Sequence, residues 1–161
     1  MKNILLVLFF VIPIASNLAQ SIPYKIENIK AFLYYNQGIG QNNSGGTFSE
    51  NIIDNDQFVL FNTIIGGGSA QGQSNQTMVV VEISGKPKDY QTRILHFKAS
   101  IRKTVLVDKM EDFASYNDGK YYVAFMLHNV GMGTLKITAE ILNGKKIESK
   151  LEKKLEFIGG E

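Results

Sequence analysis

Three side chains in this sequence carry the groups of serine-type hydrolysis, but their spacing does not match a known catalytic arrangement. Ser69 stands in a glycine-rich segment, GGGSAQG, and the second residue after it is Gln71 rather than the glycine of a nucleophile elbow. The only histidines are His96 and His128. A small hydrolase that uses His128 with a loop serine or aspartate remains an alternative. The leading expectation is a protein without enzymatic activity.

Oxygen ligands of the kind that calcium prefers gather in one short segment. Glu50, Asp54 and Asp56 are the candidate metal ligands, with asparagines between them. The segment departs from the calcium-hand loop because no glycine or terminal glutamate follows at the required spacing. The alternative is an Asx-rich turn that leads into the next strand. Calcium is therefore the one candidate ion, and no other cofactor is expected.

Two long polar segments are the most distinctive part of the sequence. Residues 36–49 and 66–76 are rich in Gly, Asn, Gln and Ser, and neither can bury a core of its own. Loops at the end of a β-sandwich often carry binding residues, so a protein or glycan partner is one reading. Plain connections between strands are the other reading. The candidate ligand-binding residues are Asn42, Asn43, Ser69, Gln73 and Asn75.

Composition excludes several classes of function. The 161 residues include no cysteine, which excludes disulfides, thiolate metal sites and a cysteine nucleophile. The formal net charge is only +2, so an electrostatic nucleic-acid binder is not expected. Basic residues outnumber acidic ones from Lys86 to Lys154, and the alternative readings are solvated strand faces or a basic sheet face.

The N-terminus has the pattern of an export signal. Lys2 precedes an apolar run, Ile4 to Ile14, which is shorter than the roughly 20 residues of a membrane span. Ala19-Gln20-Ser21 offers the small residues that a signal peptidase accepts. We expect residues 1–21 to be a signal peptide and residues 22–161 to form a single domain. The mature protein is then secreted or periplasmic, without a transmembrane span.

Alternating apolar and polar residues predict strands along the rest of the chain. Seven or eight short runs are separated by turn residues at roughly ten-residue spacing, and none has the helical period. The pattern predicts an all-β, antiparallel two-sheet sandwich of immunoglobulin-like type, with a small closed barrel as the alternative. The clearest strands are 26–35, 57–65, 77–83, 91–107, 121–130, 134–142 and 145–157.

Local patterns add three more specific expectations. Residues 91–107 make an unusually long strand, so we expect a bulge or a switch between sheets near residues 102–104. Residues 110–116 allow one helical turn, with Met110, Phe113 and Ala114 packing inward. The segment 121–130 is apolar on both faces and should be central in its sheet.

The end of the chain reads as a hairpin. Asn143-Gly144 is the strongest turn signal because both residues tolerate positive φ. In the strand that follows, alternation places Ile147 and Leu151 inward and Glu148 outward.

These observations favour a secreted or periplasmic, non-enzymatic binding or envelope-associated module whose ligand the sequence does not name. One alternative is a structural subunit that assembles through exposed strand edges, suggested by the low charge of residues 57–65 and 77–83. The hydrolase that uses His128 is the other.

Overall fold

The computed structural model describes residues 22–35, 47–53, 60–61, 74, 76–86, 92–113 and 119–158. All regular structure in these residues is β-strand, and no helix there is long and apolar enough to cross a membrane. The strands are β1 (Ile22–Tyr35), β2 (Thr47–Phe48), β3 (Leu60–Phe61), β4 (Gln76–Lys86), β5 (Arg93–Ile101), β6 (Thr104–Phe113), β7 (Lys120–Leu127), β8 (Gly133–Asn143) and β9 (Lys146–Ile158).

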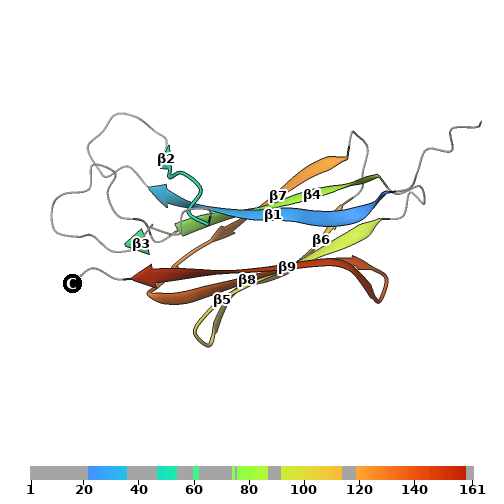
Figure 1. Cartoon of the computed structure of the whole chain (residues 1–161). Helices are drawn as coiled ribbons and strands as arrows, with labels where there is room; N and C mark the ends of the chain where they lie inside the picture. Colours follow the sequence, from blue (N-terminus) through green and yellow to red (C-terminus); the bar gives the residue numbers. More distant parts are fainter. Residues whose placement is uncertain are drawn as a thin grey trace, which may run out of the picture.

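The strands form two sheets that lie face to face (Figure 1). The four-stranded sheet has the order β2-β1-β4-β7, and the five-stranded sheet has the order β3-β9-β8-β5-β6. Neighbouring strands are antiparallel, except that the short β3 runs parallel to β9. The predicted all-β, two-sheet antiparallel sandwich is therefore confirmed.

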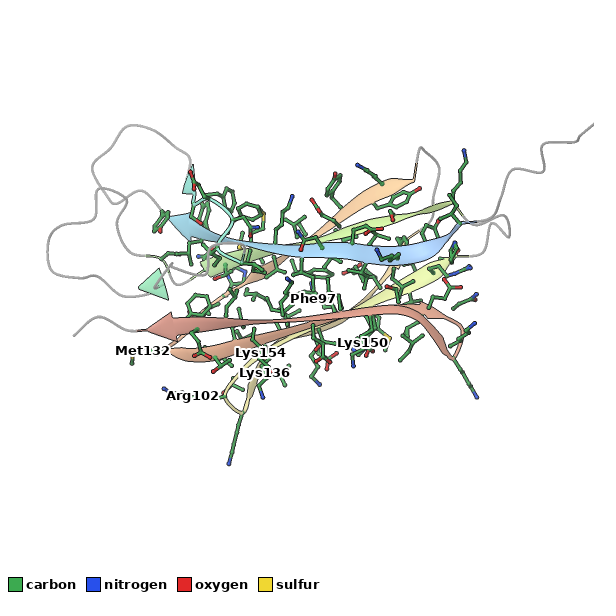
Figure 2. The ribbon with its side chains drawn as sticks, viewed as in Figure 1. Phe97, Arg102, Met132, Lys136, Lys150 and Lys154 are labelled. Carbon is green, nitrogen blue, oxygen red and sulfur yellow. The ribbon has the colours of Figure 1, made fainter. Side chains whose placement is uncertain are left out.

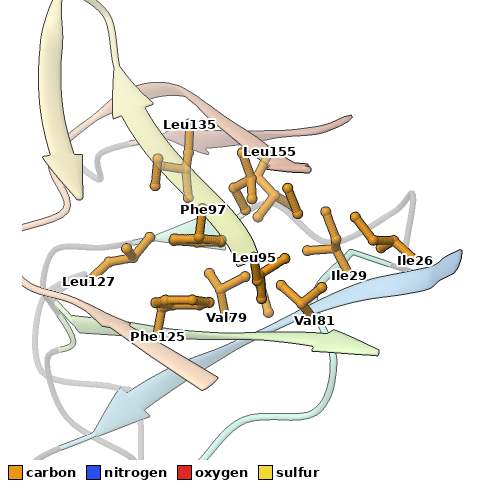
Figure 3. Packing of buried hydrophobic residues seen from close by; sticks show 14 of the residues in the cluster. Ile26, Ile29, Val79, Val81, Leu95, Phe97, Phe125, Leu127, Leu135 and Leu155 are labelled. Carbon is orange, nitrogen blue, oxygen red and sulfur yellow. The ribbon is translucent and has the colours of Figure 1, made fainter. Parts of the chain in front are cut away.

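Period-two alternation fills the space between the sheets. Successive residues of β4 and β5 alternate between buried and more exposed positions, as a pleated strand with one face on the core requires. At the centre, the rings of Phe97 and Phe125 stack in parallel across the two layers, 3.9 Å between centroids (Figure 3). The largest fully buried side chains include Ile29, Leu33, Val79, Ile83, Leu95, Leu127, Leu135 and Ile141.

One end of the sandwich holds a buried ion pair instead of an apolar contact. Arg93, the first residue of β5, points inward and donates from Nε to Glu148 Oε2 over 2.8 Å. Its guanidinium also lies 5.8 Å from the centroid of the Tyr24 ring. Tyr24 in turn meets the rings of Phe113 and Tyr121 edge-on. Aromatic and charged groups together close this end of the core.

The long strand expected over residues 91–107 is two strands. The prediction of a sheet switch was wrong, because the chain reverses at Arg102-Lys103 and β6 returns beside β5 in the same sheet. Arg102 adopts φ 52°, which lets a two-residue loop close the hairpin. A bulge does occur in this region, but it lies at Ala99/Ser100. The alternation of apolar and polar residues continues through the tight turn, so alternation alone does not distinguish one long strand from two strands joined by a hairpin.

The helical turn expected at residues 110–116 was also wrong for the part that the structure describes. Strand β6 continues to Phe113, and Met110 lies on its outer face, 64 % exposed. Phe113 does pack against the core, as expected. Ala114 lies outside the described residues. Met110 and Phe113, three residues apart, therefore lie on opposite faces of a strand at the edge of the sheet.

Strand β7 was expected to be central, yet it ends the four-stranded sheet. Its outer face is exposed despite its apolar composition, and Tyr122 is 63 % exposed. The central strand of this sheet is β4, which pairs with β1 on one side and β7 on the other. Apolar residues on both faces of a strand therefore did not predict a central position correctly for β7.

The last hairpin turns one residue later than expected. Asn143 is still paired within β8, and Gly144-Lys145 form the loop, with Gly144 at φ 59°. A bulge opposite Ile141/Leu142 then shifts the alternation of β9 by one residue. Consequently Ile147 faces outward, 49 % exposed, and Glu148 turns toward Arg93. Both orientations are the reverse of the prediction.

The strand expected at residues 57–65 lies largely outside the described residues. Only Leu60–Phe61 is described, as β3 beside the end of β9.

Candidate functional site

Most of the residues singled out from the sequence lie outside the described part of the chain. They are Asn42, Asn43, Asp54, Asp56, Ser69, Gln73 and Asn75. Glu50 is described and exposed. In the described ranges no group of three or more His, Asp or Glu side chains could hold a metal ion. The calcium and loop-ligand assignments therefore stay predictions from the sequence.

Glu50 sits in a segment that side chains fasten to β1. Ser49 Oγ accepts a hydrogen bond from Leu33 N at 2.9 Å, and Asn51 Oδ1 accepts one from Ala31 N at 3.0 Å. Asn51 Oδ1 also accepts from Ile53 N at 3.3 Å, a local contact of the Asx kind. These bonds fix Ser49 and Asn51 along the strand, while the Glu50 side chain between them faces solvent.

His128 lies just after β7 and is exposed. Neither hollow described below includes it. Ser69, its expected hydroxyl partner, is outside the described residues. A catalytic role for His128 therefore stays a prediction.

His96 lies on the outer face of the five-stranded sheet, as the alternation of β5 predicted, but it is engaged on both ring nitrogens. Nε2 is 2.8 Å from Asp108 Oδ1 on β6, and Nδ1 is 3.4 Å from Glu140 Oε2 on β8. Lys98 Nζ is 3.0 Å from Asp108, and Lys150 Nζ is 3.0 Å from Glu140. A chain of polar and charged contacts thus crosses four strands.

The charges of this network are stabilised by its own contacts. The hydrogen bond with His96, followed by the one with Lys98, lowers the pKa of the Asp108 carboxyl. The hydrogen bond from Lys150 lowers the pKa of Glu140, and the same contact raises the pKa of Lys150. Asp108, Glu140 and Lys150 therefore hold their charged forms more firmly than they would in isolation.

Beside this network the outer face of the sheet is hollowed. The depression has a volume of about 250 Å³ and spans β5, β8 and β9. We call it the lysine hollow. Figure 2 shows Lys136 and Lys154 pointing away from Phe97 and the core, on the side from which Arg102 and Lys150 also project. The residues that line the hollow are Lys98, Ser100, Lys136, Ile137, Thr138, Glu152, Lys153 and Lys154.

Two lysines face each other directly in this hollow. Lys136 on β8 and Lys154 on β9 are register partners, and both are exposed. Side chains at such positions leave the backbone only about 5 Å apart, where like charges destabilise a sheet. Among the described residues neither lysine makes an ion pair within 4.0 Å, which distinguishes them from Lys98 and Lys150 nearby.

A smaller hollow of about 100 Å³ lies on the outer face of the other sheet. Its wall includes Glu27, Glu82 and the exposed Tyr122. Both carboxylates already have partners: Glu27 accepts from Lys25 and from Ser84, and Glu82 accepts from Lys30. This hollow offers less volume and fewer open charges than the lysine hollow.

The sequence reasoning missed the lysine hollow. Alternation does place Lys98, Lys136 and Lys154 on the polar side of their strands. The order β9-β8-β5, which brings the three strands together, depends on pairing between distant segments. The excess of basic residues after Lys86 was the only available signal.

Comparison with known protein families and with curated proteins finds no match to this sequence.

Proposed function

We propose that the protein is a secreted or periplasmic, non-enzymatic β-sandwich module of immunoglobulin-like architecture that binds a polar ligand in the lysine hollow. The observation that carries the proposal is a depression of about 250 Å³ on the outer face of the five-stranded sheet, lined mainly by polar residues of three adjacent strands. The ligand belongs to a glycan or protein partner.

The flanks of the lysine hollow support a binding role. Lys98 is held by Asp108 on one side, and Glu152 is held by Lys150 on the other, each at 3.0 Å. Polar groups on strands that are fixed in this way lose little conformational freedom when a ligand arrives. The hollow is therefore preorganised along its rim.

The chemistry of the lysine hollow supports binding rather than turnover. Its hydroxyls, from Ser100 and Thr138, stand among ammonium groups and one carboxylate, Glu152, which is itself paired with Lys150. Activation of a hydroxyl nucleophile needs a neighbouring base. The nearby His96 is engaged with Asp108 and Glu140 instead. These residues suit hydrogen bonding and charge recognition.

The test is a titration of the ¹⁵N-labelled mature chain, residues 22–161, with glucose, inorganic phosphate and sodium acetate in separate series. We expect at least one ligand to shift amide signals of β5, β8 and β9 around the lysine hollow, with little change on the four-stranded sheet. Shifts that avoid these strands in every series would overturn the proposal. So would turnover of a generic ester, glycoside or peptide that His128→Ala abolishes.

A second candidate function is assembly through a strand edge, and the contrast between the two long edge strands, β6 and β7, favours it. The free edge of β6 is charged, with Asp108, Lys109, Glu111 and Asp112, and such charges discourage pairing. Strand β7 has Lys120 as its sole charged residue. The low-charge segment 77–83, which first suggested assembly, lies inside β4 and is paired on both sides.

Sedimentation velocity from about 10 μM to 1 mM tests this candidate. If β7 mediates assembly, the wild type forms dimers as concentration rises and Ala124→Lys, on the exposed outer side of β7, remains monomeric. A monomer throughout the range, or equal dimerisation of the variant, would exclude assembly through this edge.

A further inference from the structure

We infer that the lysine hollow is a site for one anionic ester group, a phosphate or sulfate ester carried by a saccharide. This inference rests on the proposed function, since it assigns a ligand class to the same hollow. It starts from the opposed lysines, which the fold brings together although the contact is unfavourable without a ligand.

The carboxylates closest to Lys154 along β9 are engaged elsewhere. Glu152, two residues before it, is 3.0 Å from Lys150 Nζ. Glu156, two residues after it, accepts a hydrogen bond of 2.6 Å from the Thr134 hydroxyl. Each of these acids has its own partner, and among the described residues neither lies within 4.0 Å of the ammonium group of Lys136 or Lys154.

The neighbours of Lys136 on β8 and β5 add hydroxyl groups, which can donate hydrogen bonds to an anion. Thr138 lies two residues further along β8, on the same face. Ser100, on β5, is the register partner of Lys136. Two ammonium groups and two hydroxyls thus line one hollow, and the one carboxylate in its lining, Glu152, is paired with Lys150. This donor set matches the several oxygens of a phosphate or sulfate better than the two oxygens of a carboxylate.

The approach to the hollow carries further positive charge. The β5–β6 loop presents Arg102 and Lys103, both exposed, next to the row of Ser100 and Lys136. Figure 2 shows Arg102 beside Lys136 and Lys154 on the same side of the sandwich. A clustered positive field of this kind attracts an anion before contact.

The charge balance of the surrounding face limits the ligand to one anionic group. The neighbouring rows of the sheet carry carboxylates of their own: Asp108 contacts Lys98, and Glu140 and Glu152 share Lys150. A long polyanion would meet these carboxylates on either side of the hollow. A single ester group on a neutral saccharide avoids them, and its hydroxyls can use the remaining polar rim.

Calorimetric or NMR titration measures the affinity of the mature chain for glucose 6-phosphate, inorganic phosphate, inorganic sulfate, acetate and glucose. We expect the phosphate and sulfate ligands to bind at least tenfold more tightly than acetate or glucose. Lys136→Gln and Lys154→Gln should each weaken phosphate binding about fivefold or more. The matched control is Lys145→Gln, in the exposed β8–β9 loop at the other end of the strands, which should leave the affinity unchanged.

Thermal unfolding gives a second readout that separates a binding role from loss of folding. Without ligand, Lys136→Gln and Lys154→Gln should have a Tm equal to or above that of the wild type, because the like-charge contact is removed. Adding phosphate should raise the Tm of the wild type and of Lys145→Gln distinctly more than that of the other two variants. Equal stabilisation of all four proteins would overturn the inference.

The remaining outcomes distinguish this inference from the proposal beneath it. Glucose or acetate binding in the hollow, with phosphate and sulfate inert, overturns the oxyanion site but leaves the binding module standing. No binding by any probe contradicts both. Vesicles containing phosphatidic acid form the last arm: binding to them in preference to glucose 6-phosphate would assign the phosphate to a lipid and overturn the saccharide source.

Discussion

Arg93 and Glu148 form the most deeply buried ion pair among the described residues, with side chains 3 % and 13 % exposed. The pair spans the end of the core, where Arg93 also faces the Tyr24 ring and Asn143 donates to the other carboxylate oxygen of Glu148 at 2.8 Å. Removing one member of such a pair leaves a charge that water cannot reach. The pair therefore makes Glu148 a sensitive position.

Glu148→Ala should lower the free energy of unfolding by about 3 kcal/mol, since Arg93 would remain buried with its main carboxylate partner removed. The matched control is Glu152→Ala, which breaks an exposed pair with Lys150 and should cost at most about 1 kcal/mol. Urea denaturation of both variants measures the difference. Equal costs would show that burial does not decide the strength of these pairs.

Asp108 and Glu140 make the stability depend on pH at the acid end. Their pKa values in the folded chain are lowered from 3.8 and 4.5, Asp108 mainly by His96 and Glu140 mainly by Lys150. A lowered folded pKa contributes stability above the unfolded pKa, and this contribution disappears as pH falls through the folded value. The urea midpoint should therefore drop below about pH 4.5. Asp108→Asn should flatten part of that drop, whereas an unchanged slope would show that Asp108 is not involved.

At the scale of the elements, tight loops and bulges decide where a strand ends and which face a side chain takes, and the alternation of apolar and polar residues does not reveal them. The inward residues Leu95, Phe97 and Ala99 were predictable because β5 is regular and half-buried. The reversal at Arg102-Lys103 was not, because neither residue is a typical turn former. The bulge on β9 inverted Ile147 and Glu148 because one extra residue exchanges the two faces of a strand.

The hairpin between β5 and β6 offers a direct test of that local geometry. Arg102 stands at φ 52°, where a residue with a Cβ atom is disfavoured by roughly 1–2 kcal/mol. Arg102→Gly should therefore raise the free energy of unfolding, by up to about 1 kcal/mol after the flexibility of glycine in the unfolded chain is counted. Lys103→Gly, whose φ is not positive, should lower it, and urea denaturation compares the two. Destabilisation by both variants would mean that contacts of the Arg102 side chain outweigh its backbone strain.

The candidate site was hidden from the sequence for a related reason. Lys98, Lys136 and Lys154 could each be assigned to the solvent face of a strand, but their proximity depends on which strands are neighbours. Pairing of β5 with β8 joins segments about 40 residues apart, and local pattern carries no record of such pairing. The fold class can be predicted from the local alternation of residues, whereas the site depends on which strands pair with one another.

At the scale of the whole molecule, the two sheets are held together by one continuous apolar layer. Phe97 and Phe125 stack across its centre, and Phe97 is completely buried. Phe97→Ala should lower the free energy of unfolding by about 3–5 kcal/mol through the cavity that it leaves. Phe97→Leu fills most of that space and should cost distinctly less. Calorimetric unfolding measures both, and a small effect of Phe97→Ala would indicate that the layers close over the gap.

Strand β1 packs against β9 of the opposite sheet. Ile26 N donates to Ser149 Oγ at 2.9 Å, across 123 residues of chain and from one sheet to the other. No early subset of strands can therefore complete the layer on which β1 rests. Chains whose contacts join such distant segments fold in milliseconds to seconds rather than microseconds. The newly made polypeptide consequently spends an extended interval with its apolar strands uncovered, and the time at which β9 arrives governs how long that exposure lasts.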